Sequence, residues 1–184
     1  MIWSFYNTSS MSERDFFLFY RMMDSSKKAR VNQTINETAK KSIVASDMLS
    51  RKLIAEWFGI HADSVNFSID EHGKPHAIDL PIHFSVSHSK GIVVCAVSDK
   101  PIGVDIEFLR TIDPRIIHRY CDDAELAYLN SDPQTNFFEL WTAKEAYTKL
   151  IGIGLAGMGS VHLAEIKDRL HTVQTKDYYL TFAI

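Results

Sequence analysis

The sequence predicts an α+β protein made of two similar halves, each with a small, mainly antiparallel sheet packed on helices. Short β-branched or alternating segments, which are typical of strands, flank longer segments with helical periodicity. In each half the order is one strand, then helices, then three strands. The halves join near Lys100-Pro101, so we expect residues 1–100 and 101–184 to form one compact unit with a ligand cleft between them.

The first half is expected to begin with a strand and to place its main helix near the middle. Residues 37–58 carry an apolar stripe at helical spacing, and Gly59 is suited to end that helix in the left-handed conformation. Residues 70–75 combine aspartate, glycine and proline, which predicts a turn. The expected elements are strands at 2–7, 65–69, 82–87 and 92–98 and helices at 12–24 and 37–58.

The second half is expected to follow the same plan with shorter helices. Its strands are expected at 102–108, 161–166, 170–175 and 178–183, and its helices at 114–120, 123–130 and 135–150. Four glycines follow the last of these helices, namely Gly152, Gly154, Gly157 and Gly159. Because no Gly-Lys-Ser/Thr accompanies them, they indicate a helix exit and a flexible loop, and not a phosphate-binding loop.

Composition narrows the classes of function. The 184 residues are 46% hydrophobic, which is enough for one sizeable core or two small ones, and the net charge of −3 provides no basic field for nucleic acid. The two cysteines, Cys95 and Cys121, imply neither a disulfide framework nor a zinc site. The first residues lack the pattern of a signal peptide, and no apolar run reaches membrane-spanning length, so we expect a cytoplasmic protein.

Two segments carry residues suited to phosphate chemistry. Asp105 and Glu107 lie two residues apart in a β-branched segment, so a strand would point both carboxylates to one face. Trp141, Glu145 and Lys149 are spaced four apart, so a helix would align them. Carboxylates bind hard cations such as Mg²⁺, which share their coordination with substrate phosphates, and a lysine neutralises phosphate charge. Taken singly, each segment also fits a solvated strand face or a surface ion pair.

In this order, the two segments carry a resemblance to a known family. Gly103-Val-Asp-Ile-Glu107 followed by Trp141-Thr-Ala-Lys-Glu-Ala-Tyr-Thr-Lys149 resembles the double signature of the 4′-phosphopantetheinyl transferase superfamily, in its larger two-half, surfactin-synthetase-activating type. Further matches are Gly73-Lys74-Pro75, Phe84-Ser-Val-Ser87-His88-Ser89 with Gly91, and Gly152-x-Gly154-Leu155. The resemblance implies a pseudo-dimer of two similar α+β halves, with the active site in the cleft between them.

The resemblance also implies an activity. Such an enzyme moves the 4′-phosphopantetheine arm of coenzyme A to a serine of an acyl, peptidyl or polyketide carrier protein, giving holo-carrier protein and 3′,5′-ADP. Asp105, Glu107 and Glu145 would hold Mg²⁺, with Mn²⁺ as an alternative. Lys149 would contact the phosphates, and Glu145 is the first candidate for the base that takes the serine proton, directly or through a water. Residues 101–184 would therefore carry the metal site and face the carrier protein.

Residues 1–100 would bind the nucleotide side of coenzyme A. The resemblance assigns Lys74 and Pro75 to the nucleotide end, and His88, which follows Ser87, to a phosphate. The basic residues expected around the 3′-phosphate are Lys27, Lys28, Arg30, Lys40 and Lys41. The chain has Lys41-Ser42-Ile43 where the family usually has arginine before a Ser/Thr-Leu pair, so Ser42 is included in this group.

Glu125 admits two interpretations. Asp122-x-x-Glu125 before Leu126 fits a capping box with aspartate in place of serine or threonine, and we favour this structural role. In the family a glutamate at this position is sometimes assigned to the shell of metal-bound water.

The partner surface and the class of function also have alternatives. Basic residues surround Ile116 and Ile117, namely Arg110, Arg115, His118 and Arg119. This basic rim would suit an acidic carrier helix; alternatively, the two isoleucines would face the core of the protein itself.

A coenzyme A-binding module without catalysis and an adaptor that binds only carriers are the competing functions. The complete acidic trio favours the enzyme, and we expect a monomer that binds neither nucleic acid nor membrane.

Overall fold

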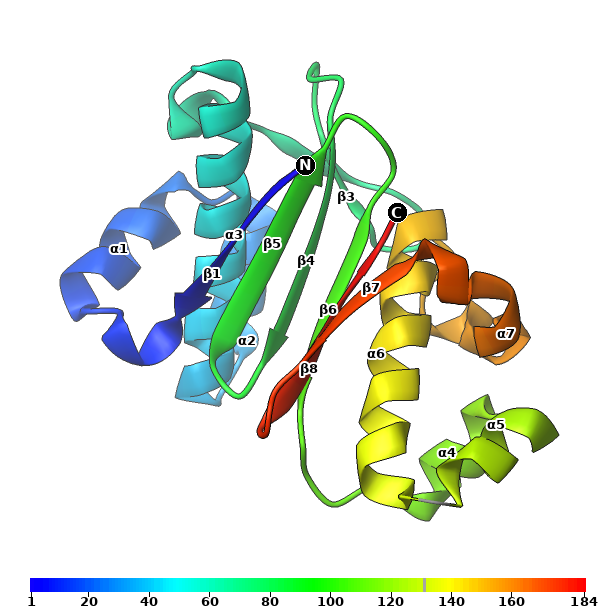
Figure 1. Ribbon diagram of the computed structural model, residues 1–184. Coiled ribbons are helices and arrows are strands. Elements are labelled where there is room, and N and C mark those ends of the chain that lie inside the picture. Colours follow the sequence, from blue (N-terminus) through cyan, green and yellow to red (C-terminus); the bar gives the residue numbers. More distant parts are fainter. Residues whose placement is uncertain (131) are drawn as a thin grey trace. The chain divides into compact units, whose positions relative to one another are not determined.

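The computed structural model describes residues 1–130 and 132–184, and it divides into two compact units (Figure 1). Unit 1 comprises Met1–Ser68 and His76–Asp99, and unit 2 comprises Ile69–Pro75 and Lys100–Ile184. Each unit contains a three-stranded antiparallel sheet packed on helices, so the predicted α+β class is confirmed. The turn segment Ile69–Pro75 packs with unit 2, whereas the sequence-based division placed it in the first half.

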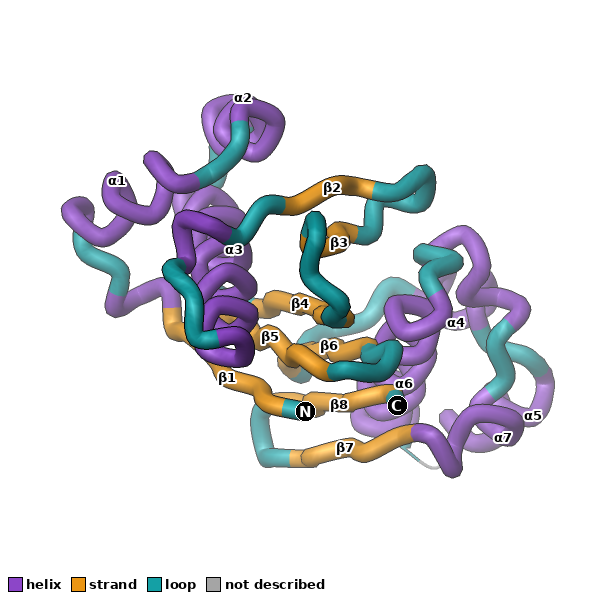
Figure 2. The backbone as a smooth tube through the Cα atoms, turned by 90° about the horizontal axis from the view of Figure 1, so that it is seen from above, coloured by secondary structure: helices purple, strands orange, loops and turns teal. Residues whose placement is uncertain are grey.

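Unit 1 is a sheet with one face covered by a long helix. The strands, in the order β1-β5-β4, are β1 (Ile2–Asn7), β5 (Ile92–Ser98) and β4 (His83–Ser89). The helices are α1 (Glu13–Met22), α2 (Ser25–Gln33) and α3 (Glu37–Phe58), with single 3-10 turns at Thr8–Ser10 and Ala62–Ser64. Seen from above in Figure 2, α3 lies along the sheet, and α1 and α2 lie beyond it. The short strands β2 (Phe67–Ile69) and β3 (Pro75–Ala77) form a separate pair.

The helix α3 forms where the apolar stripe predicts it. Asn36 accepts a hydrogen bond from the backbone N–H of Ala39 at its start, and Gly59 ends it with φ of 67°, as expected for a left-handed cap. Its buried face packs on β5, in which every residue after Ile92 is buried. The main members of this core are Val44, Leu49, Ile54, Val93, Cys95 and Val97. The burial of this face, and not helix propensity alone, holds α3 in place.

Unit 2 is a second antiparallel sheet packed against one long helix. Its strands, in the order β6-β8-β7, are β6 (Gly103–Phe108), β8 (Tyr178–Ala183) and β7 (Leu170–Gln174). Its helices are α4 (Pro114–Tyr120), α5 (Asp123–Leu129), α6 (Pro133–Ile151) and α7 (Leu163–Ile166), with 3-10 turns η3 (Leu155–Ser160) and η4 (Lys167–Arg169). Helix α6 packs on all three strands, and α4, α5 and α7 lie around it (Figure 1).

Three local expectations differ from the structure. The predicted strand at residues 161–166 is wrong, because these residues follow η3 and enter α7, whose first N–H groups include one bound by the Glu125 carboxylate. Residues 25–33 form the helix α2, which the sequence reading left as a basic cluster; Asp24 caps it by accepting from the backbone N–H of Lys27. The short strand β3 was not predicted; it follows the turn at 70–75, which forms as predicted. Among the described residues, no helix has the length and apolar content to cross a membrane.

Gly103 sets the spacing between β6 and α6. A Cβ atom at this position would lie 1.8 Å from the carbonyl oxygen of Ala146 and 2.7 Å from the backbone nitrogen of Leu150. These are backbone atoms of a buried helix, so neither can move aside as a side chain could. Glycine is required here because the strand and the helix backbone touch.

We expect Gly103→Ala to lower the free energy of unfolding by about 2–4 kcal/mol, because the new methyl group must push α6 away from the sheet. Urea unfolding followed by circular dichroism measures this loss. Gly159→Ala is the matched control, since a Cβ atom there meets nothing within 4 Å. Equal stability of the two variants would contradict the close approach.

Candidate functional site

The strand β6 directs its acidic residues toward α6. Gly103, Asp105 and Glu107 alternate along the strand and therefore share one face. Asp105 lies opposite Thr181 of β8, whose hydroxyl is 3.0 Å from the hydroxyl of Thr142 on α6. This face is thus the one that α6 covers, and Asp105 is buried there, with 3% of its surface exposed.

The helix α6 brings Glu145 and Lys149 to the same place. The Nζ atom of Lys149 donates to Oδ1 of Asp105 at 2.6 Å and lies 3.5 Å from Oε2 of Glu145. The structure therefore brings together two of the carboxylates and the lysine that the sequence pattern selected. Glu107, the third carboxylate, lies two residues along β6 and contacts the guanidinium of Arg110 at 3.4 Å.

The electrostatics of this acidic site favour a bound cation. The pKa of Glu145 is raised from 4.5 to about 7, first because the carboxyl is buried and then because Asp105 and Glu107 are negative, while Lys149 opposes the rise. Burial alone would lower the pKa of Lys149, but Asp105 and Glu145 outweigh burial and raise it. Asp105 and Glu145 share the single ammonium of Lys149, and Glu107 adds a third carboxylate nearby, so the oxygen donor set fits a hard divalent cation.

The last turn of α6 is held by a lysine from outside the helix. Lys74 donates its ammonium protons to the carbonyl oxygens of Lys149 and Leu150, at 2.5 and 3.1 Å. At the other end of the stripe, Trp141 packs against the rings of Phe137 and Tyr120, with centroids 5.5 Å apart in each pair. Trp141 thus serves the packing of α6, as its helical spacing predicted.

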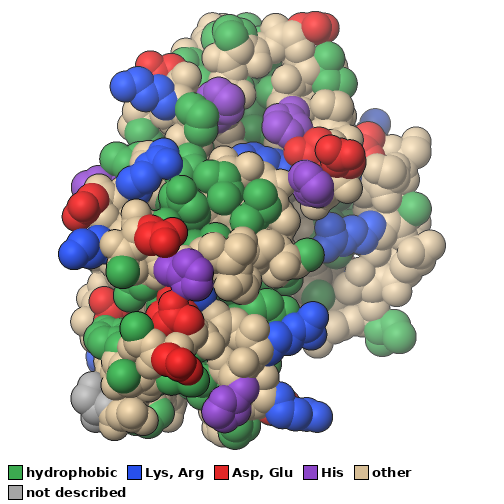
Figure 3. Space-filling model, turned by 90° about the vertical axis from the view of Figure 1, so that its right-hand side faces the viewer, with side chains coloured by type: hydrophobic (Ala, Val, Ile, Leu, Met, Phe, Trp, Pro, Cys, Tyr) green, Lys and Arg blue, Asp and Glu red, His purple; other side chains and the backbone are tan. Residues whose placement is uncertain are grey.

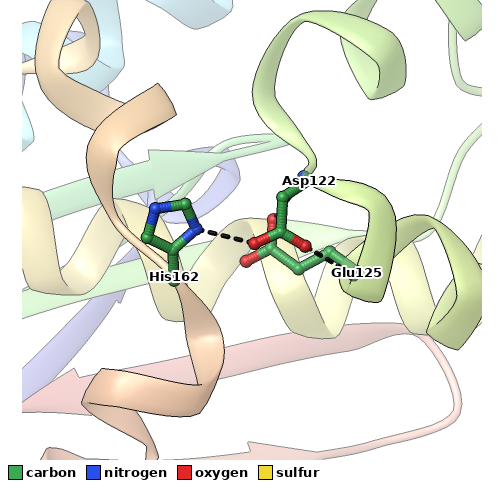
Figure 4. Close-up of side chains that lie close together, drawn as sticks. All are labelled: Asp122, Glu125 and His162. Carbon is green, nitrogen blue, oxygen red and sulfur yellow. Dashed lines mark hydrogen bonds and ion pairs between the residues drawn. The ribbon is translucent and has the colours of Figure 1, made fainter.

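A second polar cluster lies at the starts of α5 and α7 (Figure 4). Asp122 accepts from the backbone N–H of Glu125, and the Glu125 carboxylate accepts from the N–H of Asp122, which confirms the capping box. His162 turns its Nδ1 toward Oδ2 of Asp122, at 2.6 Å. The spacing of these three side chains would also fit a metal ion. Their hydrogen-bond partners show whether the cluster serves the structure or is available to a metal.

Those partners indicate a structural role for the cluster. Lys144, which is almost fully buried, donates to Oε2 of Glu125 at 2.8 Å and also to the carbonyl of Tyr120. The other Glu125 oxygen accepts from the backbone N–H of Leu163 at 3.0 Å. The ammonium of Lys144 therefore supplies the positive charge that a metal would supply, and the pair joins α4, α5, α6 and α7. A cavity of about 470 Å³ opens beside this cluster.

The predicted nucleotide-side residues of the first helices already have local contacts. Lys28 donates to the carbonyl of Arg21 at 3.0 Å, and Lys41 donates to the carbonyl of Met11 at 3.1 Å. Arg30 is exposed on α2, and Ser42 is buried on α3. A lysine can exchange such a carbonyl contact for a phosphate, so these assignments stay predictions.

Lys27 differs from its basic neighbours. Its ammonium forms a short ion pair with Asp47, whose side chain is buried, and the other oxygen of Asp47 accepts from Arg51 at 2.6 Å. Both cations also lie over the ring of Phe67, at 4.1 and 5.0 Å. Lys27 thus helps to join α2 to α3, and its predicted contact with a 3′-phosphate would require breaking this network.

The Ser87-His88 and Lys74-Pro75 pieces lie at element ends. Ser87 is buried and His88 exposed near the end of β4, just before the turn at Lys90 and Gly91, both of which have positive φ. Pro75 is half-buried at the start of β3. On the face drawn in Figure 3, basic, acidic and histidine side chains are interspersed, so no field of one sign dominates that face.

Sequence reasoning missed the structural contacts of two lysines, and a signal existed for one of them. Lys144 is spaced four residues from both Leu140 and Thr148, which are buried, so helical periodicity places it on the core face of α6. A lysine on a core face requires a buried acid, here Glu125. The contact of Lys74 with α6 joins residues 75 positions apart, and no local pattern announces it.

Two family models match consecutive parts of the chain. The model described as "4'-phosphopantetheinyl transferase, N-terminal" matches residues 9–100, which is half of the chain. The model described as "4'-phosphopantetheinyl transferase superfamily" matches residues 101–183. The second match contains all four residues of the acidic site, and the two matches meet at the position where the sequence predicts the junction of two halves.

Individual relatives agree with these matches. The 4′-phosphopantetheinyl transferase Sfp of Bacillus subtilis (strain 168) is 31% identical over 175 residues, which cover 92% of this chain and 76% of the relative. The 4′-phosphopantetheinyl transferase gsp of Aneurinibacillus migulanus is 41% identical over 113 residues, covering 59% of this chain and 47% of that protein. Another from Bacillus subtilis is 39% identical, covering 65% and 55%. The chain thus spans about half the length of the last two relatives.

The raised pKa of Glu145 makes a prediction about stability in the absence of metal. A carboxyl with pKa 4.5 when unfolded and about 7 when folded stabilises the protein below pH 4.5, and this contribution is lost as pH rises through 7. We therefore expect the unfolding free energy of the wild type, relative to Glu145→Gln, to fall by about 1–3 kcal/mol between pH 5 and 8. Denaturant unfolding in chelator measures it, with Glu165→Gln, an exposed site, as control. A pH-independent difference would contradict the assigned environment.

Proposed function

The chain belongs to the 4′-phosphopantetheinyl transferase superfamily, and on that premise we propose that it modifies carrier proteins. In the proposed reaction the serine hydroxyl of an acyl, peptidyl or polyketide carrier protein attacks the phosphorus that bears pantetheine in coenzyme A. A new O–P bond forms, the phosphoanhydride bond breaks, and 3′,5′-ADP leaves. The products are holo-carrier protein and 3′,5′-ADP.

One observation carries the proposal. Lys149 lies between Asp105 and Glu145, with Glu107 on the same strand face, inside the region that matches the family model. A solvated surface pair would leave these side chains exposed, whereas Asp105 is buried and the pKa of Glu145 is strongly raised. Buried, mutually repelling carboxylates are costly to maintain, which supports a functional reason for them.

We propose that Asp105, Glu107 and Glu145 bind Mg²⁺, with Mn²⁺ as a substitute. All three offer carboxylate oxygens, the ligands that hard divalent cations prefer, and no soft donor lies among them. When bound, such a cation withdraws charge from a diphosphate and orients it. In its absence, the Lys149 ammonium partly neutralises Asp105 and Glu145, as the two short distances indicate.

The chain's own groups have distinct roles in this proposal. Lys149 donates to phosphate oxygens as the phosphoanhydride breaks, which stabilises the negative charge that develops there. Glu145 accepts the serine proton, directly or through a water, and the water is favoured because a carboxylate that holds a metal is a weak base. The residues proposed for the nucleotide side of coenzyme A are Lys28, Arg30, Lys41, Ser42, Pro75, Ser87 and His88. Lys74, which the resemblance places with them, binds the end of α6.

The carrier protein is proposed to bind at α4. Ile116 is exposed, as docking would require, while Ile117 packs in the core of unit 2. Arg115 is exposed and paired with Asp113, and Arg119 is exposed beside the ring of Tyr120. An exposed apolar side chain between two arginines suits an acidic, partly apolar helix.

The proposed working form is a cytoplasmic monomer that binds neither nucleic acid nor membrane. A noncatalytic coenzyme A-binding module is the main alternative, and it could dispense with Glu145. An adaptor that binds carriers alone would be insensitive to coenzyme A and metal. Both alternatives predict no covalent product, so a mass assay separates them from the enzyme, and sedimentation of the purified protein tests the monomer.

The decisive experiment incubates the protein with coenzyme A, Mg²⁺ and apo-carrier proteins of the three classes. Intact mass spectrometry should show addition of one phosphopantetheine arm, and chelator should abolish it. Asp105→Asn should reduce the rate at least about 100-fold while the fold survives, because a metal ligand and the partner of Lys149 are lost together. Asp177→Asn, an exposed site, is the control. Near-normal transfer by Asp105→Asn would refute the proposed site.

Charge reversal at α4 tests the carrier surface separately. We expect Arg115→Glu with Arg119→Glu to raise KM for carrier protein about 10-fold at low salt and to leave KM for coenzyme A unchanged. Added salt should raise the wild-type carrier KM toward that of the variant, because it screens exposed charges. An unchanged carrier KM at low salt would place docking on another surface.

A further inference from the structure

We propose that Lys74 is a positioning residue that fixes the last turn of α6 and so holds Lys149 beside Asp105 and Glu145. The catalytic part of this inference rests on the proposed function, whereas its structural part does not. The resemblance assigns Lys74 to the nucleotide end of coenzyme A, so an indirect role through α6 is a different use of the same side chain.

The hydrogen-bond accounting at the end of α6 supports this role. The last carbonyl groups of a helix have no partner within it and must be bound from outside. The Thr148 carbonyl accepts from the backbone N–H groups of Gly152 and Ile153, at 2.8 and 3.2 Å. The next two carbonyls, those of Lys149 and Leu150, accept from Lys74. One ammonium therefore binds the two successive carbonyls that do not accept from the N–H groups of Gly152 and Ile153.

Burial lowers the pKa of Lys74, and its place at a helix end opposes this cost of burying the charge. A helix C-terminus carries partial negative charge, so a cation placed there is attracted as well as hydrogen-bonded. Hydrogen bonds from a charged donor are roughly twice as strong as neutral ones. The side chain of Lys74 also packs along the turn, since its Cδ lies 3.8 Å from the position of a Cβ atom at Gly152. The contact thus combines charge with packing over the helix exit.

Lys74 is itself held by a tight turn. Oδ1 of Asp70 accepts from the backbone N–H groups of His72 and Lys74, each at 2.9 Å, and the backbone N–H of Asp70 donates to the Lys74 carbonyl at 3.0 Å. Gly73 has φ of 84°, which allows the chain to close this turn. Because this turn fixes the backbone of Lys74, its side chain can hold the end of α6 at a defined distance from the turn.

The consequence for Lys149 is direct because the carbonyl that Lys74 binds belongs to Lys149 itself. The Nζ atom of Lys149 must reach Oδ1 of Asp105 through four methylene groups, so its position depends on where the Cα atom is fixed. A loosened last turn would let that Cα atom move, and a shift of about 1 Å in a catalytic group costs up to about 100-fold in rate. Lys74 therefore affects transfer without touching the phosphates.

The test uses the full chain with Lys74→Met, which keeps the length and removes the donors, and Lys74→Arg, which keeps the charge. Amide hydrogen exchange is measured first, without metal or coenzyme A. We expect Lys74→Met to speed exchange at Gly152 and Ile153 about 10-fold, because a charge-assisted hydrogen bond is lost. Lys74→Arg should restore most of the protection. Lys176→Met, an exposed site in unit 2, is the control and should change nothing.

Transfer kinetics then separate positioning from direct contact. Positioning predicts that Lys74→Met lowers kcat at least about 10-fold with KM for coenzyme A within about twofold, and that Lys74→Arg rescues kcat. A rise in KM alone, with exchange unchanged, would overturn the proposal in favour of a nucleotide contact. Faster exchange with normal kcat would also overturn it. Absence of transfer by the wild type would refute the proposed function instead, and the exchange result would still decide whether Lys74 holds the turn. Lys74→Gln replaces the Met variant if that variant unfolds.

Discussion

The contact between the backbones of β6 and α6 at Gly103 is the constraint on which the rest of the second unit depends. A strand and a helix normally pack through side chains, which keep the two backbones well apart. Here a glycine lets the strand touch the carbonyl of Ala146, next to Glu145 in the sequence. The short distance allows the carboxylate of Asp105, two residues along the strand, to reach a lysine of the helix. A larger residue at 103 would separate the groups that the proposed chemistry requires.

Burial in this region is used for two opposite purposes. In the Glu125–Lys144 pair the two opposite charges neutralise each other, and the second oxygen of Glu125 accepts from a backbone N–H. The pair therefore links helices and needs no bound ligand. The Asp105–Glu107–Glu145 group differs, because Lys149 contacts both Asp105 and Glu145, and burial together with the charges of Asp105 and Glu107 raises the pKa of Glu145. Both clusters contain the same residue types within one unit. What distinguishes them is the number of carboxylates for each ammonium: Lys144 pairs with Glu125, whereas Lys149 is shared by Asp105 and Glu145.

Much of this could be predicted from the sequence, and the failures have physical causes. Helix α3, its glycine cap, the β4–β5 hairpin and the capping box were predicted because each depends on residues near one another in the chain. The strand expected at residues 161–166 is instead a helical segment, because the Glu125 carboxylate, distant in sequence, caps its start. Periodicity placed Asp105 and Lys149 on defined faces of their own elements, and the resemblance implied that these two faces meet. The partners of Lys27 and Lys74 followed from neither, since both are set by tertiary packing.

The pairing of β6 with β8 bears on how the second unit is made. The strand that carries Asp105 and Glu107 pairs with residues 178–183, and about seventy residues of helix and turn lie between them. The entropy cost of closing so long a loop is incurred before the strand pairing can stabilise the fold, and this slows folding. During synthesis, β6 leaves the ribosome long before β8 exists, so its hydrogen-bonding edge waits unpaired while α4 to α7 are completed. The strand that carries the acidic face lacks its partner until β8 has been made, so the proposed site is among the later features of unit 2 to form.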